Sequence, residues 1–339
     1  MSTVEKPDVN SGATTAKPVP EPRRRFQAGG LWYTAGPLAV FIVFLVIVAV
    51  LQPSFLAGGG LKIASVQATP ILLVALGQAA VLLVGSIDLS NAAMALVSAV
   101  ILAKTLGSLG AVAPLVCLVV VTLIGLINGL LVVYTQVPSF ALTLGTLGIL
   151  QSAALFLTKA TTVYASSNTE VVTWLFQTFL VFIPAAFWVA VILAVVFWLV
   201  LRTTPIGQGM TAVGLNETGA LFSGLNTRLI KVIAFALSGF FAGMAGITII
   251  AQAGAASSFG LGSDLLLPGI AAAMVGGTAI TGGVANPINV VFGALIVALI
   301  PIASAAIGIP ATAQSLVYGL VIIIAVALTM SRSHAGVVK

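Results

Sequence analysis

This chain of 339 residues has few of the side chains that most enzymes use for chemistry. Its one cysteine, Cys117, and its one histidine, His334, exclude an intrachain disulfide, a cysteine- or histidine-rich metal site and a histidine-centred triad. Charged residues make up 6% of the chain, only 7 of them acidic. No G-x-x-x-x-G-K-[ST] motif is present either. An enzyme is therefore the function class that the sequence supports least.

Apolar residues are abundant instead. They account for 60% of the sequence, with a mean hydropathy of +1.23, more than a soluble domain of this length carries without aggregating. The net charge of +6 comes from Lys and Arg at the tails and between apolar runs, which does not indicate nucleic-acid binding. The composition predicts an all-α polytopic transmembrane bundle.

The apolar runs predict about ten spans, each near the roughly 20 residues that a bilayer requires, with nine or eleven left open by the glycine-rich stretches 83–91 and 276–288. Residues 31–331 form the predicted transmembrane domain. Residues 1–30 are expected to be a disordered cytoplasmic tail and 332–339 a second cytoplasmic tail. The predicted spans are 31–51, 63–83, 91–106, 111–133, 138–158, 179–201, 231–252, 265–280, 288–306 and 311–330.

The positive charges predict the orientation, because Lys and Arg are enriched in cytoplasmic loops. Ten spans place both termini in the cytoplasm. The residues then expected on the cytoplasmic side are Arg23, Arg24, Arg25, Arg202, Arg228, Lys231, Arg332 and Lys339, and those expected outside are Lys62, Lys104 and Lys159.

The longest polar interruption, 202–231, is the predicted cytoplasmic coupling segment. Within it, Asn216 is a favoured N-cap, Glu217 lies where the helix dipole favours a negative charge, and Gly224 can end a helix. A helix this short is marginal alone. We expect a separate protein to hold it; the alternative is an ordinary loop. The candidate docking residues are Asn216, Glu217, Gly219, Ala220, Ser223 and Gly224.

Asp88 is the one acidic residue near the apolar core of the first half of the chain. A charge at mid-helix costs about 2.5–3.5 kcal/mol on insertion scales. With Gly85 before it and Ser90 after it, we expect a break between helices in which Asp88 caps the next helix. A proton relay or a substrate carboxylate is the alternative. A partial echo, VGGTAITG at 275–282, suggests an internal repeat with Ala279 at the place of Asp88.

Hydroxylated solutes cross a membrane by exchanging water for hydrogen-bonding side chains, so uncharged polar residues within glycine-containing spans are candidates for a pathway. Interhelical packing produces the same composition and is the alternative for each residue. The pathway candidates are Gln78, Asn91, Asn128, Thr143, Thr146 and Gln151.

The stretch 159–178 is the longest external connection that the sequence predicts. It is either a docking surface for an extracytoplasmic partner or an interfacial helix that completes the connection.

Four separated blocks resemble the permease subunits of ribose-type bacterial ABC sugar importers. The blocks are GSIDLS at 85–90, VPSFALTLGTLGILQSAALFLT at 137–158, TPIGQGMTAVGLNETGALFSGLNTRLIKVIAFALSGFFAGMAGI at 204–247 and GIAAAMVGGTAITGGVANPINVVFGALIVALI at 269–300. Their order and spacing match over about 31–330. The resemblance implies a ten-helix permease in the bacterial inner membrane, with its coupling segment on 212–225.

The same resemblance implies the partners. They are a second permease copy or paralogue, cytoplasmic ATPase subunits, an extracytoplasmic sugar-binding protein and the lipid around the chain. No cofactor is expected on this chain, since ATP would bind the partner. The predicted function is import of a monosaccharide or related polyol. An ion-coupled secondary carrier is the alternative, and it would need ionisable groups near the midplane, where only Asp88 is available.

Overall fold

Long apolar runs fold as helices in a membrane, because only helices satisfy every backbone N–H and C=O within one segment. The computed structural model describes residues 29–53, 55, 59–257 and 263–330. Most of the predicted tail 1–30 and all of the tail 332–339 lie outside these residues. The main helices are α1 (Gly29–Leu51), α3 (Gly60–Leu83), α4 (Asn91–Leu109), α5 (Ala113–Thr135), α6 (Ser139–Thr158), α8 (Ala185–Thr203), α11 (Thr227–Ala253), α12 (Leu266–Val275), α13 (Pro287–Ala306) and α14 (Gln314–Met330).

Shorter elements connect these helices. Three helices are α7 (Glu170–Gln177), α9 (Pro205–Leu215) and α10 (Glu217–Phe222), and three short 3-10 helices are Gly110–Val112, Ser263–Leu265 and Ala311–Ala313. Strand β1 (Val163–Tyr164) pairs antiparallel with β4 (Ala255–Ala256), and β2 (Phe179–Leu180) pairs with β3 (Ile183–Pro184). Because each strand has two residues, these pairings tie loops together and leave the fold helical.

Three of the predicted boundaries were wrong. The predicted span 179–201 begins with the β2–β3 hairpin, in which Val181 and Phe182 have positive φ, so α8 starts only at Ala185. Pro184 precedes the helix because its ring fixes φ and removes a hydrogen-bond donor. The predicted span 265–280 is also too long, since α12 ends at Val275. The span predicted from Lys231 begins earlier, at Thr227, the first residue of α11.

The short α12 has a physical cause. Gly277 follows it with φ +85, and its N–H bonds to the Met274 carbonyl, which ends the helix in a left-handed turn. Ten residues of helix extend about 15 Å, half of the roughly 30 Å hydrocarbon thickness.

The helix at the centre of the bundle is α3, nearly all of whose side chains are buried from Ala68 onward. Helix α11 packs against α5, α3 and α4. The α5–α11 crossing is close because Gly125 and Gly239 face one another: a Cβ at Gly239 would lie 2.6 Å from the Val121 carbonyl oxygen. Small residues at such crossings let helix backbones approach within a membrane.

By length and composition, six helical segments of the described chain can cross a membrane: α3, the run Asn91–Thr135, α6, α8, α11 and α13. The run Asn91–Thr135 contains α4 and α5, which pack against each other on either side of Gly110. Shorter apolar helices lie at 35–51, 266–275 and 311–324. The all-α polytopic class is therefore confirmed.

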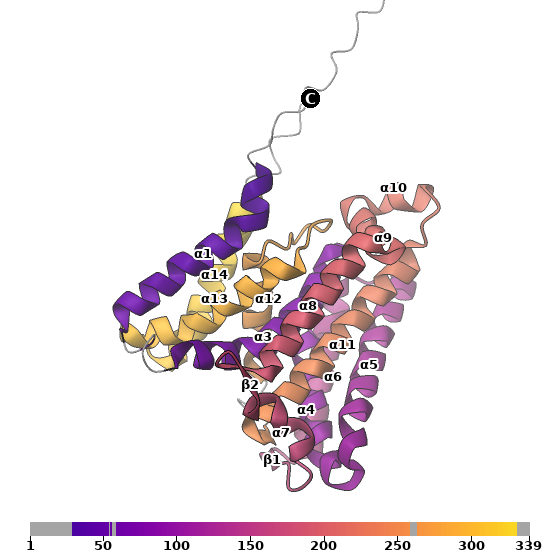
Figure 1. Ribbon diagram of the computed structural model, residues 1–339. Coiled ribbons are helices and arrows are strands. Elements are labelled where there is room, and N and C mark those ends of the chain that lie inside the picture. Colours follow the sequence, from indigo (N-terminus) through magenta and orange to yellow (C-terminus); the bar gives the residue numbers. More distant parts are fainter. Residues whose placement is uncertain (1–28, 54, 56–58, 258–262, 331–339) are drawn as a thin grey trace, which may run out of the picture.

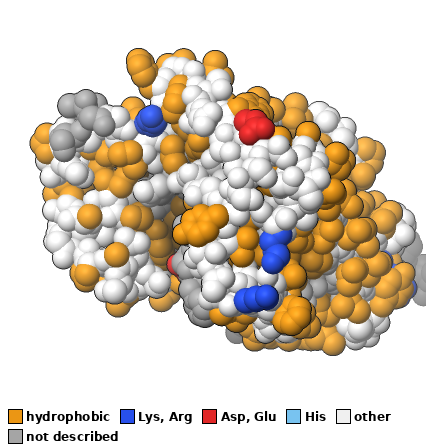
Figure 2. Space-filling model, turned by 90° about the horizontal axis from the view of Figure 1, so that it is seen from below, with side chains coloured by type: hydrophobic (Ala, Val, Ile, Leu, Met, Phe, Trp, Pro, Cys, Tyr) orange, Lys and Arg blue, Asp and Glu red, His pale blue; other side chains and the backbone are white. Residues whose placement is uncertain are grey.

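The molecule has two distinct ends. In Figure 1, α9 and α10 lie at the upper end, and α7 and β1 lie at the lower end. Figure 2 looks onto the lower end and shows few charged side chains, with hydrophobic ones gathered along the flank at the right. An apolar flank between two ends is the surface that a membrane covers.

Candidate functional site

The break between α3 and α4 holds Asp88 in a buried polar cluster. Its Oδ1 accepts hydrogen bonds from the Ser90 N–H (2.9 Å) and the Ser90 hydroxyl (2.6 Å). Its Oδ2 accepts one from the Ser238 hydroxyl on α11 (2.7 Å). All three donors are uncharged, and Asp88 is 0% exposed. These bonds offset part of the cost of burying a carboxylate.

Further bonds extend the cluster to neighbouring helices. Thr146 of α6 donates to Asn128 Oδ1 (2.9 Å), and Asn128 of α5 donates to the Ser90 hydroxyl oxygen (3.0 Å). Asn91 Nδ2 donates to the Ser238 hydroxyl oxygen (2.6 Å), and Gln78 Nε2 donates to the Asp88 carbonyl (2.7 Å). One connected network thus joins α3, α4, α5, α6 and α11.

The backbone of the break is held by hydroxyl groups on α6. The Ile87 N–H donates to Ser139 Oγ and the Leu89 N–H donates to Thr143 Oγ1, both at 3.0 Å. Two backbone groups that lie outside any helix are thereby satisfied without water, as a buried break requires.

The structure brings five of the six pathway candidates together: Gln78, Asn91, Asn128, Thr143 and Thr146. Gln151 is the exception, because it lies on an exposed face of α6, away from the cluster. Ser238 is a residue that the sequence analysis missed. It stands among small and apolar residues of α11 that are typical of helix packing, so the sequence signals neither its burial nor its role.

Helices α3 and α12 end in the same backbone turn, which also ends α6, α10 and α13. The Gly85 N–H bonds to the Leu82 carbonyl and the Ser86 N–H to the Val81 carbonyl, with φ +71 at Gly85. The same pattern ends α12, where Gly277 corresponds to Gly85. Alignment of the two turns on Gly85 and Gly277 places Ile280, rather than Ala279, opposite Asp88, but a turn shared by five helices does not test the predicted internal repeat.

The predicted coupling segment contains two helices. Helix α9 was not predicted. Helix α10 is capped by Asn216, whose Oδ1 accepts from the Gly219 N–H (3.0 Å), and Ser223 donates to the Ala220 carbonyl (2.8 Å). At the other end Gly224 has φ +86, and the Leu225 N–H returns to the Ala220 carbonyl (3.1 Å).

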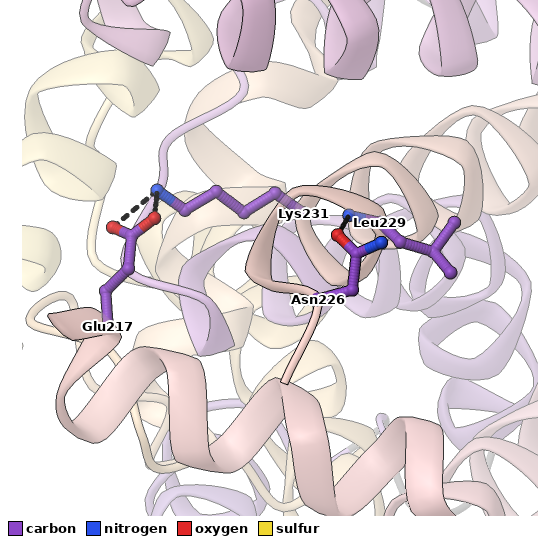
Figure 3. A network of polar contacts seen from close by, with 4 residues as sticks. All are labelled: Glu217, Asn226, Leu229 and Lys231. Carbon is purple, nitrogen blue, oxygen red and sulfur yellow. Dashed lines mark hydrogen bonds and ion pairs between the residues drawn. The ribbon is translucent and has the colours of Figure 1, made fainter. Parts of the chain in front are cut away.

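An ion pair attaches α10 to the start of α11. Lys231 Nζ lies 2.6 Å from Glu217 Oε1 and 2.7 Å from Oε2, as Figure 3 shows. In the same view Asn226 caps α11, its Oδ1 accepting from the Leu229 N–H at 3.1 Å. Glu217 is half exposed, so the pair contributes at most about 1 kcal/mol to stability. The pair links the first residue of α10 to the first turns of α11.

Large apolar side chains project from this segment without covering the rest of the chain. Phe222 is 85% exposed, and Leu215 and Leu221 are also exposed. The predicted docking residues are Asn216, Glu217 and four small residues, so these three apolar side chains were not predicted. Exposed apolar residues on a polar segment are typical of a surface that a partner covers.

A cavity of about 810 Å³ lies between α10 and the break that holds Asp88. Its lining includes Gly85 and Ser86 of the break, Ser139 at the start of α6, and Glu217 and Lys231 of the ion pair. The cavity and the buried cluster therefore meet at the residues just before Asp88.

An apolar bundle with a buried, mostly uncharged polar cluster and a capped helix at one end fits the membrane permease that the resemblance of the sequence implies. The chain belongs to the family described as branched-chain amino acid transport system / permease component, which it matches over residues 61–326. It is a multi-pass protein of the bacterial inner membrane.

Three similar proteins with known names are also permeases. The ribose import permease of Haemophilus influenzae is 30% identical over 306 residues, 89% of this chain and 94% of that protein. The galactofuranose transporter permease of Escherichia coli is 33% identical over 290 residues (81% and 82%), and the D-allose permease of the same organism 30% over 322 residues (93% and 97%). No solved structure matches the chain.

Proposed function

We propose that this chain forms the membrane pathway through which an ATP-driven importer carries a monosaccharide or related polyol. Ribose, galactofuranose and allose are the solutes in the names of its relatives. The observation that carries the proposal is the cluster around Asp88, which is buried within the bundle and built from amides and hydroxyls. Such groups exchange hydrogen bonds with sugar hydroxyls without a change of charge.

The free hydrogen-bonding capacity of the cluster favours a neutral solute. Gln78 Oε1 and Asn91 Oδ1 are buried and have no hydrogen-bond partner among the described residues, so both can accept from a hydroxyl. The charged atoms of Asp88 are already engaged by three donors. An amino acid would bring an ammonium and a carboxylate that need opposite charges, and the hydrogen bonds of the cluster come from uncharged groups.

The same geometry argues against an ion-coupled carrier. Coupling needs a group that changes its charge or binds the ion during the cycle. Asp88 is instead held as an acceptor by the Ser90 N–H and by two hydroxyl groups, in the turn that precedes α4, whose N-cap residue is Ser90. We therefore assign energy coupling to a separate ATPase, with no cofactor on this chain.

We propose ten spans with both termini in the cytoplasm. Each predicted span overlaps one of the ten main helices, although α12 is too short to cross alone. In Figure 1 the first turn of α1 and the last turn of α14 lie toward the same end as α9 and α10. Arg202 precedes α9 in the sequence, and Arg228 and Lys231 follow α10. Because Lys and Arg are enriched in cytoplasmic loops, these residues support a cytoplasmic position for this end of the molecule.

The proposed assembly contains a second permease copy or paralogue, ATPase subunits that hold α10, and an extracytoplasmic sugar-binding protein. The experiment is reconstitution of this chain with its ATPase and binding protein in vesicles, supplied with labelled D-ribose, D-allose or D-fructose and, separately, leucine. We expect ATP-dependent uptake of a sugar and none of leucine. Uptake of leucine alone, or sugar uptake driven by an ion gradient without ATP, contradicts the proposal.

A further inference from the structure

Three distant segments of the chain meet where backbone contacts backbone. The Gly283 N–H donates to the carbonyl of Leu83, in the last turn of α3, at 2.9 Å. A Cβ at Gly214, in the last turn of α9, would overlap both the Leu83 oxygen and the Gly283 nitrogen. A Cβ at Gly282 would lie 2.8 Å from the Gly214 oxygen and 3.0 Å from Gly85 Cα. We call Gly85, Gly214, Gly282, Gly283 and the Leu83 carbonyl the glycine junction.

The junction depends on glycine at its centre. Gly282 and Gly283 have φ +89 and +77, which other residues adopt only with strain. The turn they form lets Gly283 reach a carbonyl at the end of α3 that has no partner within the helix. A contact made by backbone atoms has no rotamers to absorb a displacement, so its parts move together.

The junction stands between the docking helix and the polar cluster. Gly214 lies two residues before Asn216, the cap of α10, and Leu83 lies five residues before Asp88. Gly85 also lines the cavity below α10. The other connection from α10 is the Glu217–Lys231 pair, which leads along α11 to Ser238 and so to the same carboxylate. Both routes from α10 converge on Asp88.

We propose that the glycine junction transmits movement of α10 to the helix break that holds Asp88, which makes Gly214 and Gly283 positioning residues for transport. A shift of α9 pushes directly on Leu83 and Gly283. The break and the floor of the cavity then move with it. This inference rests on the proposed ATP-driven import.

The test uses the full complex in vesicles and compares sugar uptake per ATP hydrolysed. Gly214→Ala places a methyl group against the Leu83 carbonyl, and Gly283→Ala strains the turn while its methyl group meets mainly the movable Leu215 side chain. Gly319→Ala on α14 is the matched control, because a Cβ there has no neighbour within 4 Å. We expect both junction variants to retain the ATPase and hydrolyse ATP, with uptake per ATP lowered about tenfold, and the control to equal the wild type.

Unchanged uptake per ATP in an assembled Gly214→Ala complex overturns the inference. If that variant does not assemble, Gly283→Ala decides by the same ratio. The proposed function is tested separately by the wild-type complex. If the wild type imports sugar with ATP and both variants have the same sugar uptake per ATP hydrolysed as the wild type, the junction does not transmit the movement of α10. If the wild type itself imports no sugar, the proposed function fails.

Discussion

Asp88 and Ser238 lie 150 positions apart in the sequence and share a hydrogen bond of 2.7 Å between Oδ2 and the serine hydroxyl. The same hydroxyl oxygen accepts from Asn91 Nδ2 at 2.6 Å. Ser238 therefore joins the break between α3 and α4 to α11, the helix that begins beside α10. This bond connects the end of the molecule that carries α10 with the buried centre of the bundle.

Removing this hydroxyl should destabilise the protein more than removing a comparable neutral one. Ser238→Ala takes away one of three donors to a buried carboxylate, worth about 1.5–3 kcal/mol. The matched control is Ser98→Ala, also fully buried, whose hydroxyl donates to the neutral Gly243 carbonyl; we expect a loss of about 0.5–1.5 kcal/mol there. Thermal unfolding midpoints in detergent measure the difference. Equal shifts of the two unfolding midpoints would show that the hydrogen bond to Asp88 stabilises the protein no more than the bond to the neutral carbonyl does.

The side chain of Asp88 should act through hydrogen bonding rather than through its charge. Asp88→Asn keeps the oxygen that accepts from the Ser90 N–H and hydroxyl, so we expect substantial transport. Asp88→Leu leaves these donors buried without a partner, at about 1–3 kcal/mol for each group, and should lose assembly or transport. Sugar uptake in vesicles distinguishes the two variants. An Asp88→Asn protein that inserts normally but transports nothing contradicts this hydrogen-bonding role.

The sequence was most informative where a feature is local. Apolar runs located the main helices, and Asn216, Glu217 and Gly224 predicted α10, because caps and glycine termini depend on neighbouring residues. The break at Asp88 was likewise predictable, since an isolated charge in an apolar region needs polar partners, although the N-cap of α4 is Ser90 rather than Asp88.

Features that depend on tertiary contacts could not be predicted. Ser238 belongs to the cluster only because α11 packs against α3 and α4, and the sequence around it indicates packing alone. The Gly283–Leu83 hydrogen bond joins segments 200 residues apart. Gln151 was a pathway candidate because of its residue type, but it lies on an exposed face of α6.

The orientation of the chain can be tested by labelling. On a Cys117→Ala background, Ser167→Cys places a thiol on the exposed loop before α7, and Gln208→Cys places one on the exposed side of α9. An impermeant maleimide should label the first in intact cells and the second only after permeabilisation. The reverse pattern would invert the proposed topology.

The last prediction concerns docking by α10. Phe222 is 85% exposed and covers little of this chain, so Phe222→Ser should leave folding intact and remove apolar surface from the partner contact. A fully buried aromatic anchor is often worth 2 kcal/mol or more in an interface, which is about a thirtyfold loss of affinity. The matched control is Phe182→Ser, because Phe182 is 86% exposed in the β2–β3 turn. Co-purification of the ATPase at limiting concentration measures the effect. Only the Phe222 variant should lose its ATPase. If the Phe222 variant retains as much ATPase as the Phe182 variant does, α10 is not the docking element. The turn between α5 and α6 is then the next candidate, because it lines the same cavity as α10.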